Sequence, residues 1–336
     1  MKTIRTQDAV GMPLAHDLTQ IIPGEYKGAR FKKGHIVTEK DIPVMLSMGK
    51  EHLYVLELGA DDVHEDEAGQ RIAQSAAGVN STLRPKGEGK VELVAACRGV
   101  LRVDRDKLLE LIDDDEIMFA TIGGNQMVEQ DQLLAGTRVI PLYVSEQTVS
   151  RAESVRDVIH VDPLHPARVG IVTTGSEIYH GLIEDKFGDI LRHKFAALDC
   201  DVIGQVISDD DEQMIADSIH QMIAQDANFI AVTGGMSVDP DDRTPAGIRR
   251  AGTEIITYGA PVLPGAMFLL GYLGDVPVVG LPGCVMYHGA SVFDLVVPRL
   301  LAGEHMDRRA IKLLGHGGLC RNCPQCSYPN CGFGKG

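Results

Sequence analysis

The stretch "ARVGIVTTG" (Ala167–Gly175) decides the fold of the second half of the chain. Its apolar run is short, is rich in β-branched residues and ends in a Thr-Gly turn, which predicts a buried strand. From this stretch onward, apolar strands alternate with helical segments as far as about residue 303. Such alternation indicates a parallel sheet covered by helices on both faces. We therefore predict an α/β fold with a doubly wound, mostly parallel sheet.

Three further strands and four helices are expected after this first strand. The strands are "CDVIGQVIS" (200–208), "NFIAVTGG" (228–235) and "VPVVGLPG" (276–283). The helices are expected over 184–199, 208–225, 244–252 and 285–303. Ser208 or Asp209 is the predicted N-cap of the second helix. The acidic run Asp209–Asp211 is interpreted as a helix start with a favourable dipole interaction, in preference to a metal site.

The pattern divides the chain into three regions. Residues 1–160 predict a smaller mixed α/β N-terminal region of one or two domains, residues 161–304 the doubly wound domain, and residues 305–336 a Cys-rich tail. Within the first region, "VHEDE" (63–67) is interpreted as the solvated start of a helix, in preference to a metal site. "RPKGEGK" (84–90) is interpreted as a hairpin turn, in preference to a phosphate grip.

Composition and charge exclude several classes of function. The 336 residues are 44% hydrophobic and carry a net charge of −15, which disfavours binding to a nucleic-acid backbone. No run reaches the roughly 20 apolar residues of a membrane span, and the N-terminus lacks the apolar core of a signal peptide. The seven cysteines do not form a disulfide framework, because four fall in the last 17 residues. We expect a cytoplasmic protein.

Three Gly turns follow three of the predicted strands: Thr174–Glu177, Thr233–Gly235 and Leu281–Gly283. In a doubly wound sheet the carboxyl ends of the strands converge on one edge, where ligands of open α/β folds bind. Glycines let backbone N–H groups turn toward an anion, and helix N-termini add partial positive charge at the same place. The sequence therefore predicts an anion-binding edge.

Carboxylates accompany these turns where a phosphate cradle normally brings a lysine. The stretch "VTGGMSVDPDDRTP" (232–245) carries acidic residues, and Arg243 is its one cation. Glu177 and Asp242, each beyond a Gly turn, suit Mg²⁺, which binds a few carboxylates together with waters and ligand phosphates. The alternative for Asp242 is capping of the helix that begins near Thr244. The alternative for the neighbouring acids, Asp239 and Asp241, is ordinary turn chemistry.

The order of the turns resembles a known family. "TTGSEI", "VISDDDEQM", "TGGMSVDPDDRTP", "LPGAMFLLG" and "VVGLPG" are similar to the molybdopterin-binding domain of molybdenum-cofactor biosynthesis proteins. The resemblance spans Ala167–Leu301 and is closest to the molybdopterin molybdotransferase branch. It implies Mg²⁺-dependent insertion of molybdate into adenylated molybdopterin. It also implies a homo-oligomer. The expected protein partner is a molybdoenzyme or another cofactor-synthesis protein.

The resemblance assigns roles to individual residues. It implies that Glu177 and Asp242 hold Mg²⁺ and act in catalysis, while backbone amides hold the pterin phosphate. The residues that it places in contact with molybdopterin are Thr174, Gly175, Ser176, Thr233, Gly234, Gly235, Ser237, Pro264, Gly265, Pro282 and Gly283.

Several positions depart from the family pattern. Ser176 stands where the family usually has Asp, Ala266 where it has a lysine, and Cys284-Val285 where it has Asn-Pro. The N-terminal half also lacks the Asp-Gly-Tyr-Ala motif of a full molybdotransferase. These departures keep open a second hypothesis, a non-catalytic protein that carries or senses the cofactor. A third, weaker one is an adenylyltransferase. We expect Cys284 to pack at the start of the last helix and not to bind molybdenum.

The tail "CRNCPQCSYPNCGFGKG" (320–336) carries a separate signal. Its cysteines follow C-x₂-C-x₂-C-x₄-C spacing, and four thiolates suit either Zn²⁺ or an iron–sulfur cluster. The alternatives are a disordered tail with free thiols, or adventitious disulfides. The Gly-rich "LLGHGG" (313–318) predicts a hinge, so the tail is expected to be a mobile docking or redox appendage. The four predicted ligands are Cys320, Cys323, Cys326 and Cys331.

Overall fold

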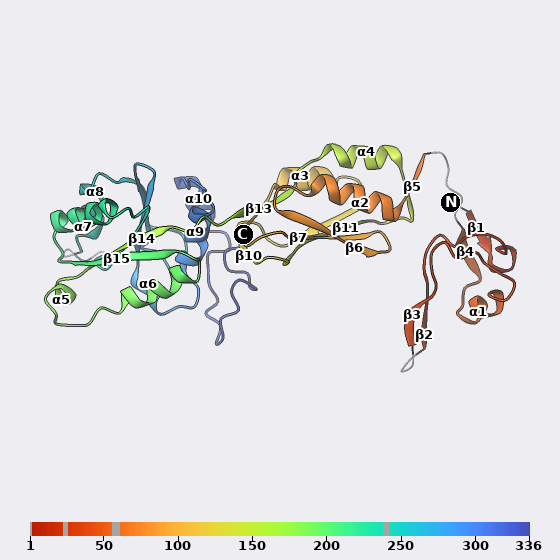
Figure 1. Ribbon diagram of the computed structural model, residues 1–336, viewed down its shortest axis with the longest axis horizontal. Helices are drawn as coiled ribbons and strands as arrows, with labels where there is room; N and C mark the ends of the chain where they lie inside the picture. The colour runs from red at the N-terminus through yellow and green to blue at the C-terminus, as the bar shows by residue number, and fades with distance from the viewer. Residues whose placement is uncertain (1, 23–25, 56–60, 238, 240–241) are drawn as a thin grey trace. The chain divides into compact units, whose positions relative to one another are not determined.

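The structure, a computed structural model, describes residues 2–22, 26–55, 61–237, 239 and 242–336. The chain divides into two compact units (Figure 1). The first unit comprises residues 1–96, 103–122 and 130–160, and the second comprises residues 97–102, 123–129 and 161–336. Asp241, for which turn chemistry was expected, lies outside the described residues.

The first unit is built from short antiparallel sheets. Its longest helix, α2 (Glu65–Ala76), contacts β7 and β11 of a four-stranded sheet of order β6-β7-β11-β9. Its strands are β1 (Lys2–Arg5), β2 (Leu18–Ile22), β3 (Tyr26–Phe31), β4 (His52–Val55), β5 (Asp62–His64), β6 (Ser81–Gly87), β7 (Lys90–Ala95), β9 (Ile117–Thr121), β11 (Leu133–Val139) and β12 (Tyr143–Ser145). A three-stranded sheet of order β10-β8-β13, formed by β8 (Gly99–Val103), β10 (Met127–Val128) and β13 (Ile159–Pro163), lies mostly in the second unit. The remaining helices are η1 (Thr6–Asp8), α1 (Ile42–Ser47), α3 (Arg105–Leu111) and α4 (Glu146–Ser154).

Two local predictions in this unit can be compared directly with the structure. The acids of "VHEDE" lie in the first turn of α2, as expected for a helix start, but Glu65 is buried, so the start is not solvated throughout. Two of them are paired with cations: Glu65 with Arg138 at 3.0 Å and Asp66 with Lys33 at 2.5 Å. The stretch 84–90 turns from β6 into the antiparallel strand β7, so its interpretation as a hairpin turn is confirmed.

The second unit contains a six-stranded sheet of order β15-β14-β16-β19-β18-β17. Its strands are β14 (Arg168–Thr174), β15 (Asp201–Ser208), β16 (Phe229–Thr233), β17 (Glu254–Tyr258), β18 (Leu269–Leu273) and β19 (Val276–Leu281). Its helices are α5 (Ser176–Tyr179), α6 (Phe187–Ala196), α7 (Glu212–Ala224), α8 (Thr244–Arg250), η2 (Gly283–Met286), α9 (Val292–Leu301) and α10 (Arg308–Leu313).

The predicted doubly wound, mostly parallel sheet is confirmed. β15, β14, β16 and β19 pair in parallel, whereas β18 pairs antiparallel with both β19 and β17. The two antiparallel pairings were not predicted from the sequence. They bring residues 259–268, which join β17 to β18, to the carboxyl edge of the parallel strands.

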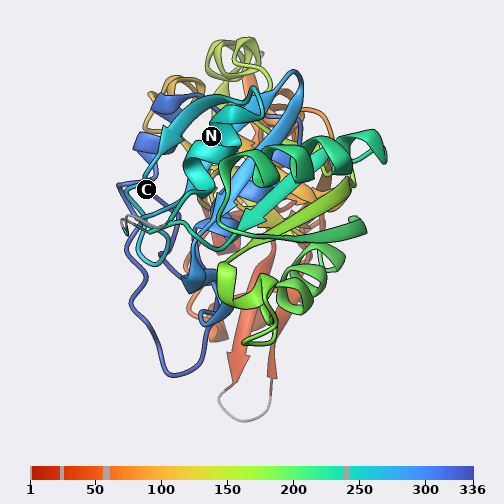
Figure 2. The ribbon, with the colours of Figure 1, turned by 90° about the vertical axis from the view of Figure 1, so that its left-hand side faces the viewer.

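Helices cover both faces of this sheet (Figures 1 and 2), and the buried strands contribute side chains to a core on either face. Ile171 and Ala231 pack in one cluster with residues of α6 and α9. Val172 and Val232, their immediate neighbours, pack in a second cluster with residues of α7 and α8. This period of two, with both faces apolar, is the reason that the strands appear in the sequence as continuous apolar runs.

The last predicted helix begins later than expected. The sequence suggested one helix over 285–303, but η2 ends at Met286 and α9 starts at Val292. The cause is a capping box, in which the Ser291 side chain accepts from the backbone of α9 and Asp294 accepts from the Ser291 N–H at 2.8 Å. Cys284 therefore lies in η2 and not at the start of the last helix, which corrects that expectation.

This cap gives a first testable prediction. We expect Ser291→Ala to lower the free energy of unfolding of the second unit by about 1 kcal/mol, because an N–H of α9 loses its acceptor. Chemical denaturation followed by circular dichroism measures the change. An unchanged midpoint would show that the cap contributes nothing to stability.

The Cys-rich tail differs from the mobile appendage that was expected. Leu263 donates to the carbonyl of Gly318 and accepts from the N–H of Cys320, both at 2.8 Å. At the far end of the tail, Gly334 donates to the carbonyl of Gly317 at 2.9 Å. These bonds close residues 317–334 into a loop and fix it to the segment between β17 and β18.

Aromatic side chains anchor the same loop. Tyr328 donates to the carbonyl of Asp294 in α9 at 2.9 Å, and Phe333 is buried in the core cluster that contains α6 and α9. Nothing in the sequence indicated this docking, because two aromatic residues in a Gly-rich stretch show no periodicity.

Candidate functional site

The first two Gly turns lie against each other at the carboxyl edge of the sheet. Gly234 has a φ of 90°, and a Cβ at this position would lie 2.0 Å from the carbonyl oxygen of Thr174. A Cβ on Gly235, at φ 50°, would lie 2.6 Å from the hydroxyl of Thr244. Only glycine permits this approach of the two turns, so the glycines are structural requirements of the edge.

Buried threonine hydroxyls stabilise the contact between the two turns. The buried hydroxyls of Thr174 and Thr244 lie 2.7 Å apart, and Thr233 donates to the carbonyl of Leu281 at 3.4 Å. These contacts connect the ends of β14, β16 and β19 to the start of α8. The predicted convergence of the turns is therefore present in the structure.

Two acidic residues that were interpreted as helix capping lie at the edge instead. Asp211 alone caps α7, accepting from the N–H groups of Gln213 and Met214. Asp210 accepts from the N–H of Ser176 at 2.8 Å, and Asp209 accepts from the Ser176 hydroxyl. Sequence reasoning missed these two residues, although a helix needs only one cap and the run offers three acids.

Asp210 has an unusual environment. Its Oδ1 is buried without a hydrogen-bond partner among the described residues. Burial raises the pKa of its carboxyl above the ordinary value, and the negative charges of Glu177, Asp209 and Asp242 raise it further. The Ser176 N–H opposes this shift. The acids thus form one electrostatically coupled group, which favours a cation.

A prediction on stability follows from this raised pKa. Protonated Asp210 favours the folded state. This contribution to the free energy of unfolding is lost as the pH rises from the ordinary pKa of 3.8 through the raised pKa of the folded state. At neutral pH the ionised carboxylate therefore costs stability. We expect Asp210→Asn, which keeps an oxygen to accept from Ser176, to raise the thermal midpoint at pH 7. A lower midpoint in differential scanning fluorimetry would contradict the assigned shift.

Asp242 has a different role from the capping alternative. It accepts from the N–H of Ser237 at 2.6 Å, whereas the residue at the N-cap of α8, Arg243, makes no side-chain cap. From β17, Tyr258 donates to the carbonyls of Met236 and Ser237, each at 3.1 Å. Ser237 is thus held by Asp242 on one side and by Tyr258 on the other, and Tyr258 is a further residue that the sequence did not reveal.

Of the two later turns, the one at Pro264–Gly265 lies against the start of α9. Gly265, at φ 135°, is so close to Val292 that a Cβ would lie 2.4 Å from that side chain, and Val292 donates to the carbonyl of Pro264 at 3.1 Å. Ala266 is exposed and provides no cation at this turn. Pro282 and Gly283 follow β19 directly, with Gly283 exposed.

Cys284 follows this last turn. It is half-buried in η2, and burial raises the pKa of its thiol. The thiol is therefore less readily ionised than an exposed one and is a poorer metal ligand.

The edge thus brings the Gly turns and their carboxylates together. The N–H groups of Gly175, Ser176 and Ser237 already donate within it, to Ser208, Asp210 and Asp242. Within the described parts of the chain, no three His, Cys, Asp or Glu side chains are grouped closely enough to hold a metal ion by themselves. This arrangement fits Mg²⁺ that takes only one or two protein carboxylates and completes its shell with phosphate oxygens and waters. The unpartnered Oδ1 of Asp210 is buried, and a Cβ on Gly235 would lie 3.3 Å from it.

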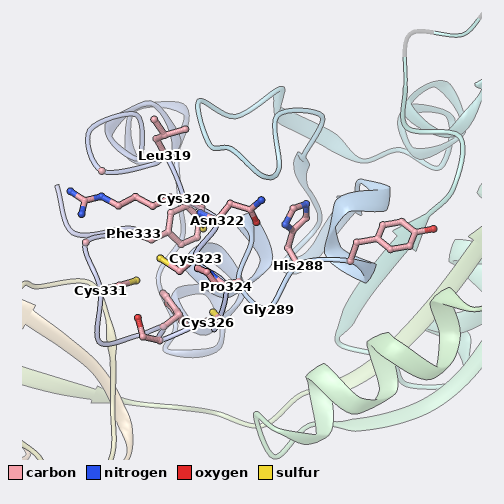
Figure 3. Close-up of a pocket in the computed structure, with 17 residues that line it drawn as sticks. His288, Gly289, Leu319, Cys320, Asn322, Cys323, Pro324, Cys326, Cys331 and Phe333 are labelled. Carbon is pink, nitrogen blue, oxygen red and sulfur yellow. Dashed lines mark hydrogen bonds between the residues drawn. The ribbon is translucent and has the colours of Figure 1, made fainter.

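The tail cysteines surround a separate pocket of about 450 Å³. Figure 3 shows them around this hollow together with His288 and Gly289, which come from the segment between η2 and α9. Cys323 and Cys326 are exposed, and Cys320 and Cys331 are half-buried. All seven cysteines of the chain carry free thiols.

Comparison with known proteins agrees with the site. Residues 170–302 match the family described as "Probable molybdopterin binding domain". This part of the chain is a molybdopterin-binding domain. Residues 3–57 match a "Domain of unknown function (DUF8806)". No curated protein matches the chain. The resemblance to molybdenum-cofactor biosynthesis proteins is confirmed, and the assignment to the molybdotransferase branch stays a prediction.

Several solved structures also match parts of the chain. One is the molybdopterin biosynthesis enzyme MoaB from Thermus thermophilus, at 20% identity and TM-score 0.34, over 41% of this chain and 98% of that one. Another is the tungsten cofactor synthesizing protein MoaB from Pyrococcus furiosus, at 17% identity and TM-score 0.34, over 42% and 98%. A molybdenum cofactor biosynthesis protein from Pyrococcus furiosus matches 90% of this chain and 63% of that one, at 13% identity and TM-score 0.28.

One further negative finding concerns membranes. Among the described residues, no helix is both long enough and apolar enough to cross a bilayer.

Proposed function

We propose that the chain acts in molybdenum-cofactor biosynthesis and inserts molybdate into adenylated molybdopterin in a Mg²⁺-dependent transfer. The observation that carries the proposal is the convergence of the Gly turns and the coupled acids on one edge of a molybdopterin-binding domain. Amides of the turn at Gly234–Gly235 would hold the pterin phosphate, and the buried hydroxyls of Thr174 and Thr244 fix the position of this turn. Gly175, whose N–H donates to the Ser208 carbonyl at 3.3 Å, would lie beside the ligand.

The carboxylates at this edge would hold the metal and position the second turn. Glu177 is exposed beside the first turn and would hold the metal, while the buried Asp210 would add negative charge to the same group of acids. Asp242 would also hold the metal. In addition, it would position Ser237 through the hydrogen bond that it accepts from the Ser237 N–H. When bound, Mg²⁺ would neutralise negative charge on the phosphoanhydride. The residues of the chain itself would bind and orient the ligand.

A second function is favoured by one observation. Ala266 is exposed on the loop where the resemblance leads us to expect a lysine, so a cation for phosphate or molybdate is missing. A protein with this loop would still bind molybdopterin through its amides and would carry or sense the cofactor without catalysis. In either case we propose a homo-oligomer that delivers its product to a molybdoenzyme or to another cofactor-synthesis protein.

We also propose that the Cys-rich tail binds a metal, as Zn²⁺ or as an iron–sulfur cluster. The support is the common pocket that Cys320, Cys323, Cys326 and Cys331 line.

The test is to incubate the full chain with adenylated molybdopterin, Mg²⁺ and molybdate. Release of AMP together with molybdenum cofactor is the expected result. Tight binding of the pterin without AMP release would overturn catalysis and leave the carrier function. Absence of pterin binding under these conditions would overturn both functions.

A further inference from the structure

The tail pocket has the shape of a site for an extended group. A single Zn²⁺ binds each thiolate at about 2.3 Å, which requires four sulfurs in close mutual contact. The structure has instead a hollow of about 450 Å³ with the four thiols on its wall, and no tight set of three ligands exists among the described residues. In a four-iron cluster each iron takes one thiolate, so the sulfurs stand apart around the core.

The backbone around the first cysteine also suits a cluster. Asn322 has a φ of 53° and turns its N–H toward the Sγ of Cys320 at 3.4 Å. Backbone N–H groups turned inward by such left-handed residues form concavities that bind anions, iron–sulfur clusters among them. Arg321 lines the same pocket and adds a positive charge near four thiolates. These donors would offset the negative charge of a thiolate-bound cluster.

The opposite wall of the pocket belongs to the molybdopterin-binding domain. His288 and Gly289 line it, a short distance along the chain after the last ligand turn at Pro282–Gly283. A Cβ on Gly289 would lie 2.9 Å from the Cβ of Cys326 and 3.1 Å from its Sγ. The tail can therefore approach this wall only because residue 289 is glycine.

We infer that the pocket binds a four-iron, four-sulfide cluster, held by Cys320, Cys323, Cys326 and Cys331 against the segment that follows the last ligand turn. This inference rests on the proposed metal-binding tail and decides between its two candidates. It does not depend on the pterin site. The docking bonds at both ends of the loop keep the cluster at a fixed place beside the domain.

The experiment is anaerobic reconstitution of the full chain with ferrous iron and sulfide, followed by measurement of iron, acid-labile sulfide and zinc. We expect about four irons and four sulfides per chain, and an electron paramagnetic resonance signal after reduction. Stoichiometric zinc that iron and sulfide do not replace would overturn the cluster and leave a metal-binding tail. Protein that binds neither would overturn both proposals, whatever its affinity for molybdopterin.

Matched variants locate the site. Cys323→Ser, at an exposed position, is expected to lose most of the iron without loss of fold, whereas Cys97→Ser, outside the pocket, is expected to keep it. Gly289→Val leaves every thiol in place and blocks the approach of Cys326. It should reduce reconstituted iron as strongly as the cysteine variant. Full iron in both Cys323→Ser and Gly289→Val would show that a cluster, if bound, lies elsewhere.

Discussion

Gly234→Ala is expected to abolish molybdopterin binding and to destabilise the second unit by about 3 kcal/mol, as strain in a disfavoured φ adds to a steric clash. The added Cβ would lie 2.0 Å from the carbonyl oxygen of Thr174, which is backbone and has no alternative rotamer. Relief requires the first and second turns to separate, so the amides no longer converge. Fluorescence titration with molybdopterin and chemical denaturation measure the two effects.

Gly274→Ala is the matched control for this change. Gly274 also has a positive φ, 59°, but a Cβ there would meet nothing within 4 Å. It lies between β18 and β19, at the opposite edge from the turns. We expect a loss of about 1 kcal/mol from backbone strain and unchanged molybdopterin affinity. Equal losses in the two variants would show that the crowding of Gly234 has no special importance.

Glu177→Gln is expected to weaken Mg²⁺-dependent binding or turnover by more than about tenfold, which corresponds to about 1.4 kcal/mol. The side chain is exposed beside the first turn, so its loss removes a negative charge without disturbing the core. Asp242→Asn should have a comparable effect, since the loop contact with Ser237 can be retained by the amide oxygen. Titrations with and without Mg²⁺ measure the change.

Glu254→Gln provides the control for the loss of one carboxylate. Glu254 is exposed at the start of β17, at the amino edge of the sheet and thus at the opposite edge from the ligand turns. Its replacement changes net charge by the same amount and should leave the Mg²⁺ dependence unchanged. If Glu177→Gln and Asp242→Asn bind and turn over ligand like the parent, the metal interpretation of the edge is wrong.

The sheet and its ligand edge were predictable because they rest on local signals. Continuous apolar strands such as 167–175 and the Gly turns after them specify both the parallel sheet and the end at which the turns meet. The hairpin of β17 and β18 was missed, because its strands surround the irregular segment 259–268, which shows no short turn signal.

Other features depend on contacts that are distant in the sequence. Asp210 turns toward Ser176, 34 residues earlier, and a run of three acids before a helix does not show which acid caps it. The docked tail depends on Leu263 and Asp294, to which Cys320 and Tyr328 bond. Backbone pairing of this kind leaves no trace in composition, so a Gly-rich tail was expected to be mobile.

Amide hydrogen exchange with and without molybdopterin tests the central claim most directly. If the Gly turns hold the ligand through their N–H groups, exchange slows in peptides that cover Gly175–Glu177, Gly234–Ser237 and Gly283–Cys284. Exchange in the β6–β7 hairpin of the first unit stays unchanged. Saturable binding of molybdopterin that leaves all three turns unprotected would contradict the account.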